Sequence, residues 1–149
     1  METKELKKTK IAGKASFTLT KQESFEVDDN HILMLRQSEG TNKSVGKNDF
    51  MDGAKVTNIA FLDLTNMSGP QEGYVIMEKD GNKTITKWHG TTISKTSSNG
   101  KPMLTFRGTM EQIKGTGKYK NTKGTFRYTG HFTSETDYVS EWEGDFIQK

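Results

Sequence analysis

Apolar and polar residues alternate with a period of two along much of this chain of 149 residues. No stretch of twelve residues keeps apolar residues at helical spacing without an intervening glycine or β-branched cluster. A period of two is typical of strands with one buried and one exposed face. The pattern predicts eight strands, at residues 13–20, 30–38, 54–64, 73–79, 82–95, 102–113, 124–134 and 137–148.

Turn-forming sequences separate most of these segments. Asp80-Gly81 and Asn99-Gly100 are strong β-hairpin signals, and residues 28–30 also tolerate a positive φ. Short connections make sequential strands antiparallel neighbours, and eight strands are enough for a sheet to close on itself. We therefore predict an all-β protein, a single eight-stranded antiparallel β-barrel, with a two-sheet β-sandwich as the alternative.

A triplet of an aromatic residue, any residue and glycine recurs in the last four predicted strands. The four copies are Trp88-His89-Gly90, Phe106-Arg107-Gly108, Tyr128-Thr129-Gly130 and Trp142-Glu143-Gly144. Glycine inside a strand is typical of a sharp bend, and a neighbouring aromatic ring can cover the bare backbone. The repeat favours the closed barrel over the sandwich.

The last two strands predict which face lies inside. A tight turn near residues 134–137 pairs Tyr128 with Trp142 and Arg127 with Glu143. One face is then aromatic and the other charged, so we expect the aromatic face to line the lumen.

Two registers are open for residues 82–95. A strict two-residue turn at Asn99-Gly100 places His89 on the face of Phe106, whereas a longer loop places Trp88 there. The triplet pattern favours the longer loop, with Trp88 inside and His89 outside.

The early strands are apolar on both faces, at residues 32–35 and 59–62. A barrel wall of this kind needs a cover on its outer side. Either the N-terminal segment or a second copy of the chain could supply it, and we expect a homo-oligomer.

Composition removes several classes of protein. The chain has 22 Lys and Arg, 19 Asp and Glu, a net charge of +3 and no cysteine. Disulfide scaffolds, thiolate zinc sites and cysteine nucleophiles are excluded, and no segment is apolar over the roughly eighteen residues of a membrane span. Residues 1–12 lack the apolar stretch of a secretion signal. We predict a flexible basic tail at 1–12, a barrel domain at 13–149 and a cytoplasmic location.

Three polar residues are candidates for catalysis: Asp63, His31 and Tyr128. Asp63 stands among apolar neighbours, where a buried carboxylate with a raised pKa can transfer protons. The alternative is an exposed carboxylate at a strand end. His31 is the histidine that we place nearest the lumen. The three histidines lie more than forty residues apart and lack metal-ligand spacing, so we expect no metal and no cofactor.

The basic residues of the second half do not predict a phosphate or nucleic-acid site. Gly117-Lys118 lacks the Ser or Thr and the helix that a phosphate loop needs, which favours a glycine-rich turn. The aromatic residues share a face with glycines rather than with lysines, which fits a lumen better than a base-stacking platform.

Residues 39–53 form a long connection with Phe50 and Met51 near its end. That loop is either a lid or a plug of the barrel end.

Residues 115–126, Gly-Thr-Gly-Lys-Tyr-Lys-Asn-Thr-Lys-Gly-Thr-Phe, resemble a segment of the allene oxide cyclase and dirigent type of β-barrel. The wider layout of roughly residues 100–148 is most similar to uncharacterised bacterial members of that family. The resemblance implies an eight-stranded antiparallel barrel with an apolar lumen, often dimeric or trimeric. Characterised members cyclise or couple reactive organic intermediates, and no motif here carries their catalytic residues over.

The expected function is binding of a small, largely apolar molecule in the lumen. The predicted ligand-binding residues are Trp88, Phe106, Phe126, Tyr128 and Trp142. The alternative is a cyclase or isomerase that acts inside the barrel. A third possibility is a barrel that binds single-stranded nucleic acid or a protein partner.

Overall fold

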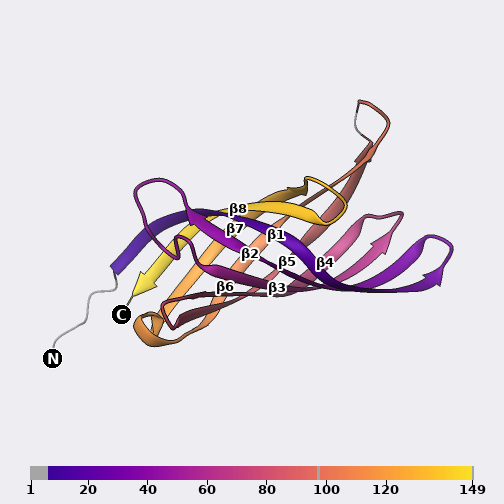
Figure 1. The fold of residues 1–149 in the computed structure, drawn as a ribbon. Coiled ribbons are helices and arrows are strands. Elements are labelled where there is room, and N and C mark those ends of the chain that lie inside the picture. The colour runs from indigo at the N-terminus through magenta and orange to yellow at the C-terminus, as the bar shows by residue number, and fades with distance from the viewer. Residues whose placement is uncertain (1–6, 97, 149) are drawn as a thin grey trace.

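The first and the last strand of the chain pair with each other, which closes the sheet into a ring (Figure 1). The computed structural model describes residues 7–96 and 98–148. The elements are β1 (Lys7–Asp28), β2 (His31–Ser44), β3 (Lys55–Thr65), β4 (Gly69–Lys79), β5 (Asn82–Thr96), β6 (Pro102–Gly115), the short 3-10 helix η1 (Gly117–Tyr119), β7 (Thr122–Phe132) and β8 (Asp137–Gln148). Every neighbouring pair is antiparallel, so the predicted eight-stranded antiparallel barrel is confirmed.

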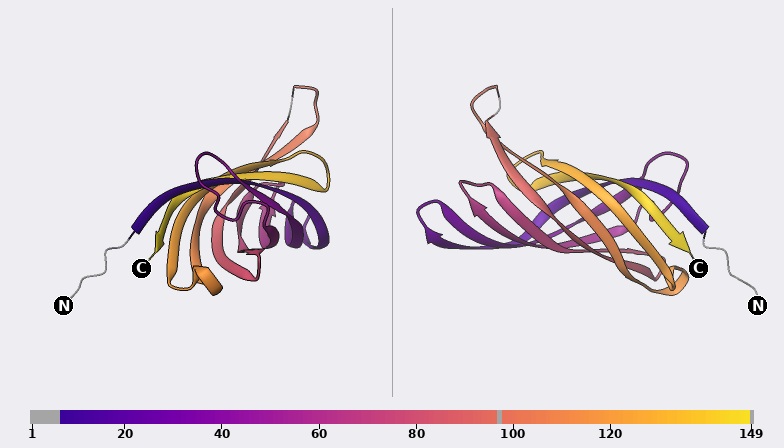
Figure 2. Two further views of the ribbon diagram at one scale, coloured as in Figure 1. Left: turned by 60° about the vertical axis from the view of Figure 1, so that its left-hand side comes forward. Right: turned by 180° about the vertical axis from the view of Figure 1, so that it is seen from behind.

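The two ends of the ring differ. β1 pairs with β8 only as far as Thr18, but it continues beside β2 as far as Asp28. The β1–β2 and β5–β6 hairpins therefore project separately at one end, while the chain ends at the other (Figures 1 and 2). We call the first the hairpin end and the second the terminal end.

Several strands are longer than the alternation predicts. β1 starts at Lys7, so the predicted boundary at residue 13 falls inside a strand, and residues 1–6 lie outside the described part. Residues 7–12 pair with β8, which buries Ile11. Residues 20–30 are exposed on both faces, and their two alternating apolar residues, Phe25 and Val27, are too few to predict a strand in this part of β1.

The predicted inner face is confirmed in the last strands. Tyr128 pairs with Trp142, and both are buried, while Arg127 and Glu143 form an exposed ion pair of 3.3 Å. Trp88 is also buried and His89 is exposed. The cause is the longer β5–β6 loop, in which the last pair is Thr96 with Pro102.

Inner aromatic side chains lie directly on glycine backbone. A β-carbon at Gly90 or Gly108 would overlap the Tyr128 hydroxyl, and one at Gly130 would overlap the Phe106 ring. The rings therefore occupy the space that other residues would use for their own side chains, as the triplets predict.

The loop after β2 fills the terminal end of the barrel. Met51 is buried, and the Phe50 ring packs against the rings of Tyr119, Trp142 and Phe146 at centroid distances of 5.3, 5.9 and 4.9 Å. The Asn42 Nδ2 atom donates a hydrogen bond of 3.0 Å to the Met51 carbonyl oxygen. Of the two predicted roles, the contacts fit a plug.

Large apolar side chains cover part of the outer wall of β1 to β4. We call this set the outer apolar patch, and its members are Phe25, Leu33, Leu35, Ile59, Phe61 and Tyr74. Leu35 pairs with Phe61, and Phe61 is 58% exposed. The N-terminal segment from Lys7 onward is part of the ring and does not cover the patch. A contiguous exposed apolar surface is typical of an interaction site.

We propose that a second copy of the chain covers the outer apolar patch. Light scattering should give a mass above the monomer mass of 16.8 kDa. Phe61→Lys should shift the protein toward the monomer, because burying an unpaired charge in an interface is costly. Thr129→Lys, on the exposed face of β7, is the matched control and should not. A monomeric wild-type protein at micromolar concentration contradicts the proposal.

Candidate functional site

A cavity of about 70 Å³ lies inside the ring. Its aromatic lining comprises Phe17, Trp88, Phe106, Tyr128, Phe132, Tyr138 and Trp142. Its polar lining comprises Arg36, Ser38, Asn58, Gln71 and Ser140. Because one water needs about 10–15 Å³ by this measure, the cavity has room for on the order of five waters. The interior is therefore neither completely filled nor wide.

Four of the five predicted ligand-binding residues line this cavity: Trp88, Phe106, Tyr128 and Trp142. Phe126 does not. It packs against Trp142 nearer the terminal end and lines a separate space of about 20 Å³ beside Phe50. Phe126 does point inward, as predicted. It nevertheless lies outside the cavity, because the plug separates the terminal end of the interior from the rest.

Asn58 connects two of the rings. Its Nδ2 atom donates a 2.9 Å hydrogen bond to the Tyr138 hydroxyl, and its Oδ1 atom accepts one of 2.8 Å from Trp88 Nε1. Burial raises the pKa of Tyr138, and hydrogen bonds with Asn58 and Ser38 oppose that shift. Both rings are thus held in fixed orientations around the cavity.

Gln71 holds Tyr128 in the same way. The Gln71 Nε2 atom donates a 3.2 Å hydrogen bond to the Tyr128 hydroxyl, while its Oε1 atom accepts one of 2.7 Å from Thr92. Burial raises the pKa of Tyr128 to about 12, and the hydrogen bond from Gln71 opposes the shift. Tyr128 is therefore a neutral phenol at pH 7, suited to donate a hydrogen bond and unsuited to act as a base.

Arg36 is a charged residue of the cavity that the sequence analysis missed. It is 9% exposed and its Nε atom donates a 3.0 Å hydrogen bond to Gln22 Oε1. One terminal nitrogen lies 3.4 Å from Met34 Sδ, and the guanidinium carbon is 5.3 Å from the centroid of the Phe132 ring. Burial lowers the pKa of Arg36, and the electrostatic interaction with Tyr138 opposes the shift. Residues 32–35 are apolar on both faces, so the alternation did not show on which side of this strand Arg36 lies.

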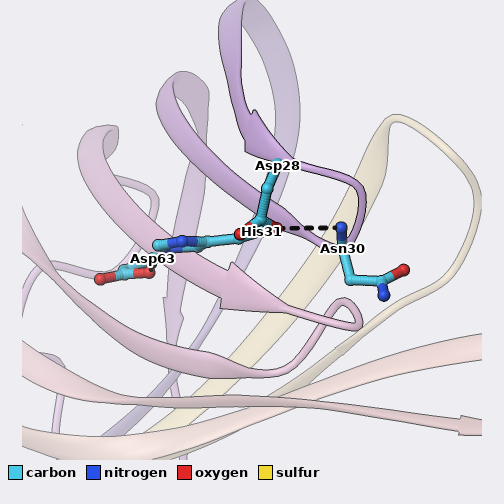
Figure 3. A network of polar contacts seen from close by, with 4 residues as sticks. All are labelled: Asp28, Asn30, His31 and Asp63. Carbon is cyan, nitrogen blue, oxygen red and sulfur yellow. Dashed lines mark hydrogen bonds and ion pairs between the residues drawn. The ribbon is translucent and has the colours of Figure 1, made fainter.

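His31 and Asp63 meet at the hairpin end, away from the cavity lining. The His31 Nε2 atom lies 2.5 Å from Asp63 Oδ1, and the Asp63 side chain is 54% exposed (Figure 3). Next to them, the Asn30 backbone N–H donates a 3.3 Å hydrogen bond to Asp28 Oδ1. His31 lies at the rim and does not line the cavity, although it is less exposed than His89 and His131. Of the three candidate catalytic residues, the cavity contains Tyr128 alone.

The Gly115–Gly117 segment is a structural turn. The Lys83 backbone N–H donates to Thr116 Oγ1 at 3.0 Å, and the Lys118 backbone N–H donates to Asn82 Oδ1 at 2.9 Å. Tyr119, which follows directly, is buried beside Phe50. Across the described ranges, no group of three or more acidic or histidine side chains could hold a metal ion, and no helix is long and apolar enough to cross a membrane.

Two solved structures share this architecture. The pterocarpan synthase dirigent protein GePTS1 matches with a TM-score of 0.56 and 11% identity, over 100% of this chain and 89% of that chain. The chain has a dirigent-like β-barrel fold. The pterocarpan synthase dirigent protein PsPTS1 matches with a TM-score of 0.52 and 12% identity, over 99% and 98% of the two chains. No family model and no curated protein matches the sequence.

The raised pKa of Tyr128 in this dirigent-like barrel predicts a pH-dependent stability. The folded state favours the neutral phenol of Tyr128. The contribution of this phenol to the free energy of unfolding is therefore complete below pH 10 and is lost as the pH rises through about 12. The free energy of unfolding should fall more over this interval in the wild type than in Tyr128→Phe, by on the order of 2 kcal/mol.

Urea titrations at a series of pH values measure this difference. Tyr74→Phe, which removes an exposed phenol, is the matched control for loss of a hydroxyl group. Equal slopes for the wild type and Tyr128→Phe contradict the burial of this phenol.

Proposed function

We propose that this dirigent-like barrel binds a small, largely apolar molecule in its aromatic cavity. One observation carries the proposal. Phe50 and Met51 fill the terminal end of the barrel, and the interior on the other side of them is partly empty. Aromatic walls with a few oriented polar groups are typical of small-molecule sites. The matched solved structures are dirigent proteins named as pterocarpan synthases, which supports an aromatic organic ligand.

A cyclase or isomerase is the second candidate, and Tyr128 is the observation in its favour. A neutral phenol held by Gln71 can donate a hydrogen bond to an oxygen atom of a bound molecule and so polarise it. The cavity lining contains no carboxylate or imidazole among the described residues, which leaves proton abstraction without a base. Ligand binding is therefore the better supported function. Catalysis here would depend on enclosure of the substrate in the cavity and on the hydrogen bond that Tyr128 can donate.

The nucleic-acid alternative has less support. A base-stacking platform needs exposed aromatic rings among basic residues. Here Trp88, Tyr128 and Trp142 are buried. Oligonucleotide binding would weaken steeply as the salt concentration rises, whereas binding in an apolar cavity would not.

The proposal is tested by filling the cavity. Ser140 lines it, so Ser140→Leu should weaken binding of the neutral single-ring probe 3-phenylpropanamide by about tenfold, because the added side chain occupies the site. Isothermal titration calorimetry measures the affinity, and native mass spectrometry searches the purified protein for a retained molecule. Glu141→Leu is the matched control, since Glu141 is exposed on the same strand.

A wild-type protein that binds neither the amide nor any retained molecule contradicts the proposal. It would favour a barrel that acts through its outer surface. Equal affinity in Ser140→Leu and the wild type would instead place the probe outside the cavity.

A further inference from the structure

The cavity contains a buried cation without a counter-charge. Arg36 is 9% exposed, and its polar contacts are the neutral Gln22 amide and the Met34 sulfur. Among the ion pairs of the described residues, none includes Arg36. Buried charged side chains are otherwise almost always paired, because an uncompensated charge in an apolar setting is unfavourable. An arginine keeps its proton at neutral pH, so loss of the charge does not relieve the cost.

The acidic residues of the neighbouring strands do not reach the guanidinium. Glu23 on β1, Glu39 on β2 and Asp63 on β3 are all exposed. Asp63 is instead paired with His31. Glu26 on β1 shares the face of Gln22 and Arg36, but it is also exposed, and no ion pair of the described residues joins it to Arg36.

The surroundings of Arg36 fit one end of an elongated ligand. The Phe132 ring lies under the guanidinium, and Ala60, the partner of Arg36 on β3, also lines the cavity. Tyr138 is close enough to interact electrostatically with Arg36. Arg36 and the rings of Trp88, Phe106 and Tyr128 line one cavity, so a single molecule can contact the cation and the rings together.

We propose that the ligand of this cavity is an aromatic or apolar carboxylic acid whose carboxylate binds Arg36. The planar guanidinium matches a carboxylate in geometry as well as in charge. The apolar body of the acid then lies against the aromatic rings deeper in the barrel. This inference rests on the proposed function, because it names the chemical class of the molecule that the cavity binds.

A pair of probes that differ only in charge tests the inference. 3-Phenylpropionate and 3-phenylpropanamide share the ring and the chain, and they differ in a carboxylate against a neutral amide. By calorimetry at neutral pH, the acid should bind the wild-type protein about tenfold more tightly than the amide, or better. This comparison needs no variant and so does not depend on the folding of one.

Variants then assign the preference to Arg36. In Arg36→Met the acid should lose about tenfold in affinity while the amide keeps its affinity within about threefold. Arg107→Met removes the same charge from the exposed face of β6 and should leave both affinities unchanged. Circular dichroism of each variant confirms the β-sheet content before titration.

The outcomes separate the two proposals. Equal affinities of acid and amide in the wild type overturn the carboxylate inference and leave the proposed function standing. A preference for the acid that persists in Arg36→Met also overturns it, because the charge is then bound elsewhere. Failure of both probes to bind overturns the carboxylate inference, and if the purified protein also retains no molecule, it contradicts the proposed function itself.

Discussion

The indole of Trp142 lies across Gly13, at the seam where the first and last strands meet. Gly13 and Trp142 are directly paired across β1 and β8, and a β-carbon on Gly13 would meet three atoms of the indole. The indole Nε1 atom also donates a 2.9 Å hydrogen bond to Asn42 Oδ1 on β2, and Asn42 in turn binds the Met51 carbonyl oxygen. One side chain thus joins the closure of the ring to the plug at its terminal end.

The cavity follows from this arrangement. Phe50 packs on Trp142, so the terminal half of the interior is filled by side chains. The hairpin half is lined by rings that lie on glycine backbone and is only partly filled. Within that half, Asn58 and Gln71 fix the orientation of Trp88, Tyr128 and Tyr138, and Arg36 supplies a single positive charge. The site is therefore aromatic and contains one charge without an ion-pair partner, and these are the two features on which the proposed acidic ligand depends.

The sequence predicted those features that depend on local periodicity. The turn near residues 134–137 was sufficient for the pairing of Tyr128 with Trp142, and the triplets were sufficient for the inward position of Trp88, because turn and pleat are local properties. The part of β1 at residues 20–28 lacks a buried face, and the two apolar residues Phe25 and Val27 were too few to predict it. Arg36 was missed because a charge at an inward position violates the pattern that identified the strand. The separation of Phe126 from the cavity depends on the plug, a contact between distant segments.

A double-mutant cycle on Gly13 and Trp142 tests the role of the seam most directly. Free energies of unfolding from urea titrations are compared for the wild type, Gly13→Ala, Trp142→Leu and the double variant. If the indole occupies the space of a Gly13 side chain, Gly13→Ala should destabilise the wild type but have much less effect when the indole is absent. The two sites should therefore couple by about 1–2 kcal/mol. Effects that add within about 0.5 kcal/mol would show that the indole does not hold the seam closed.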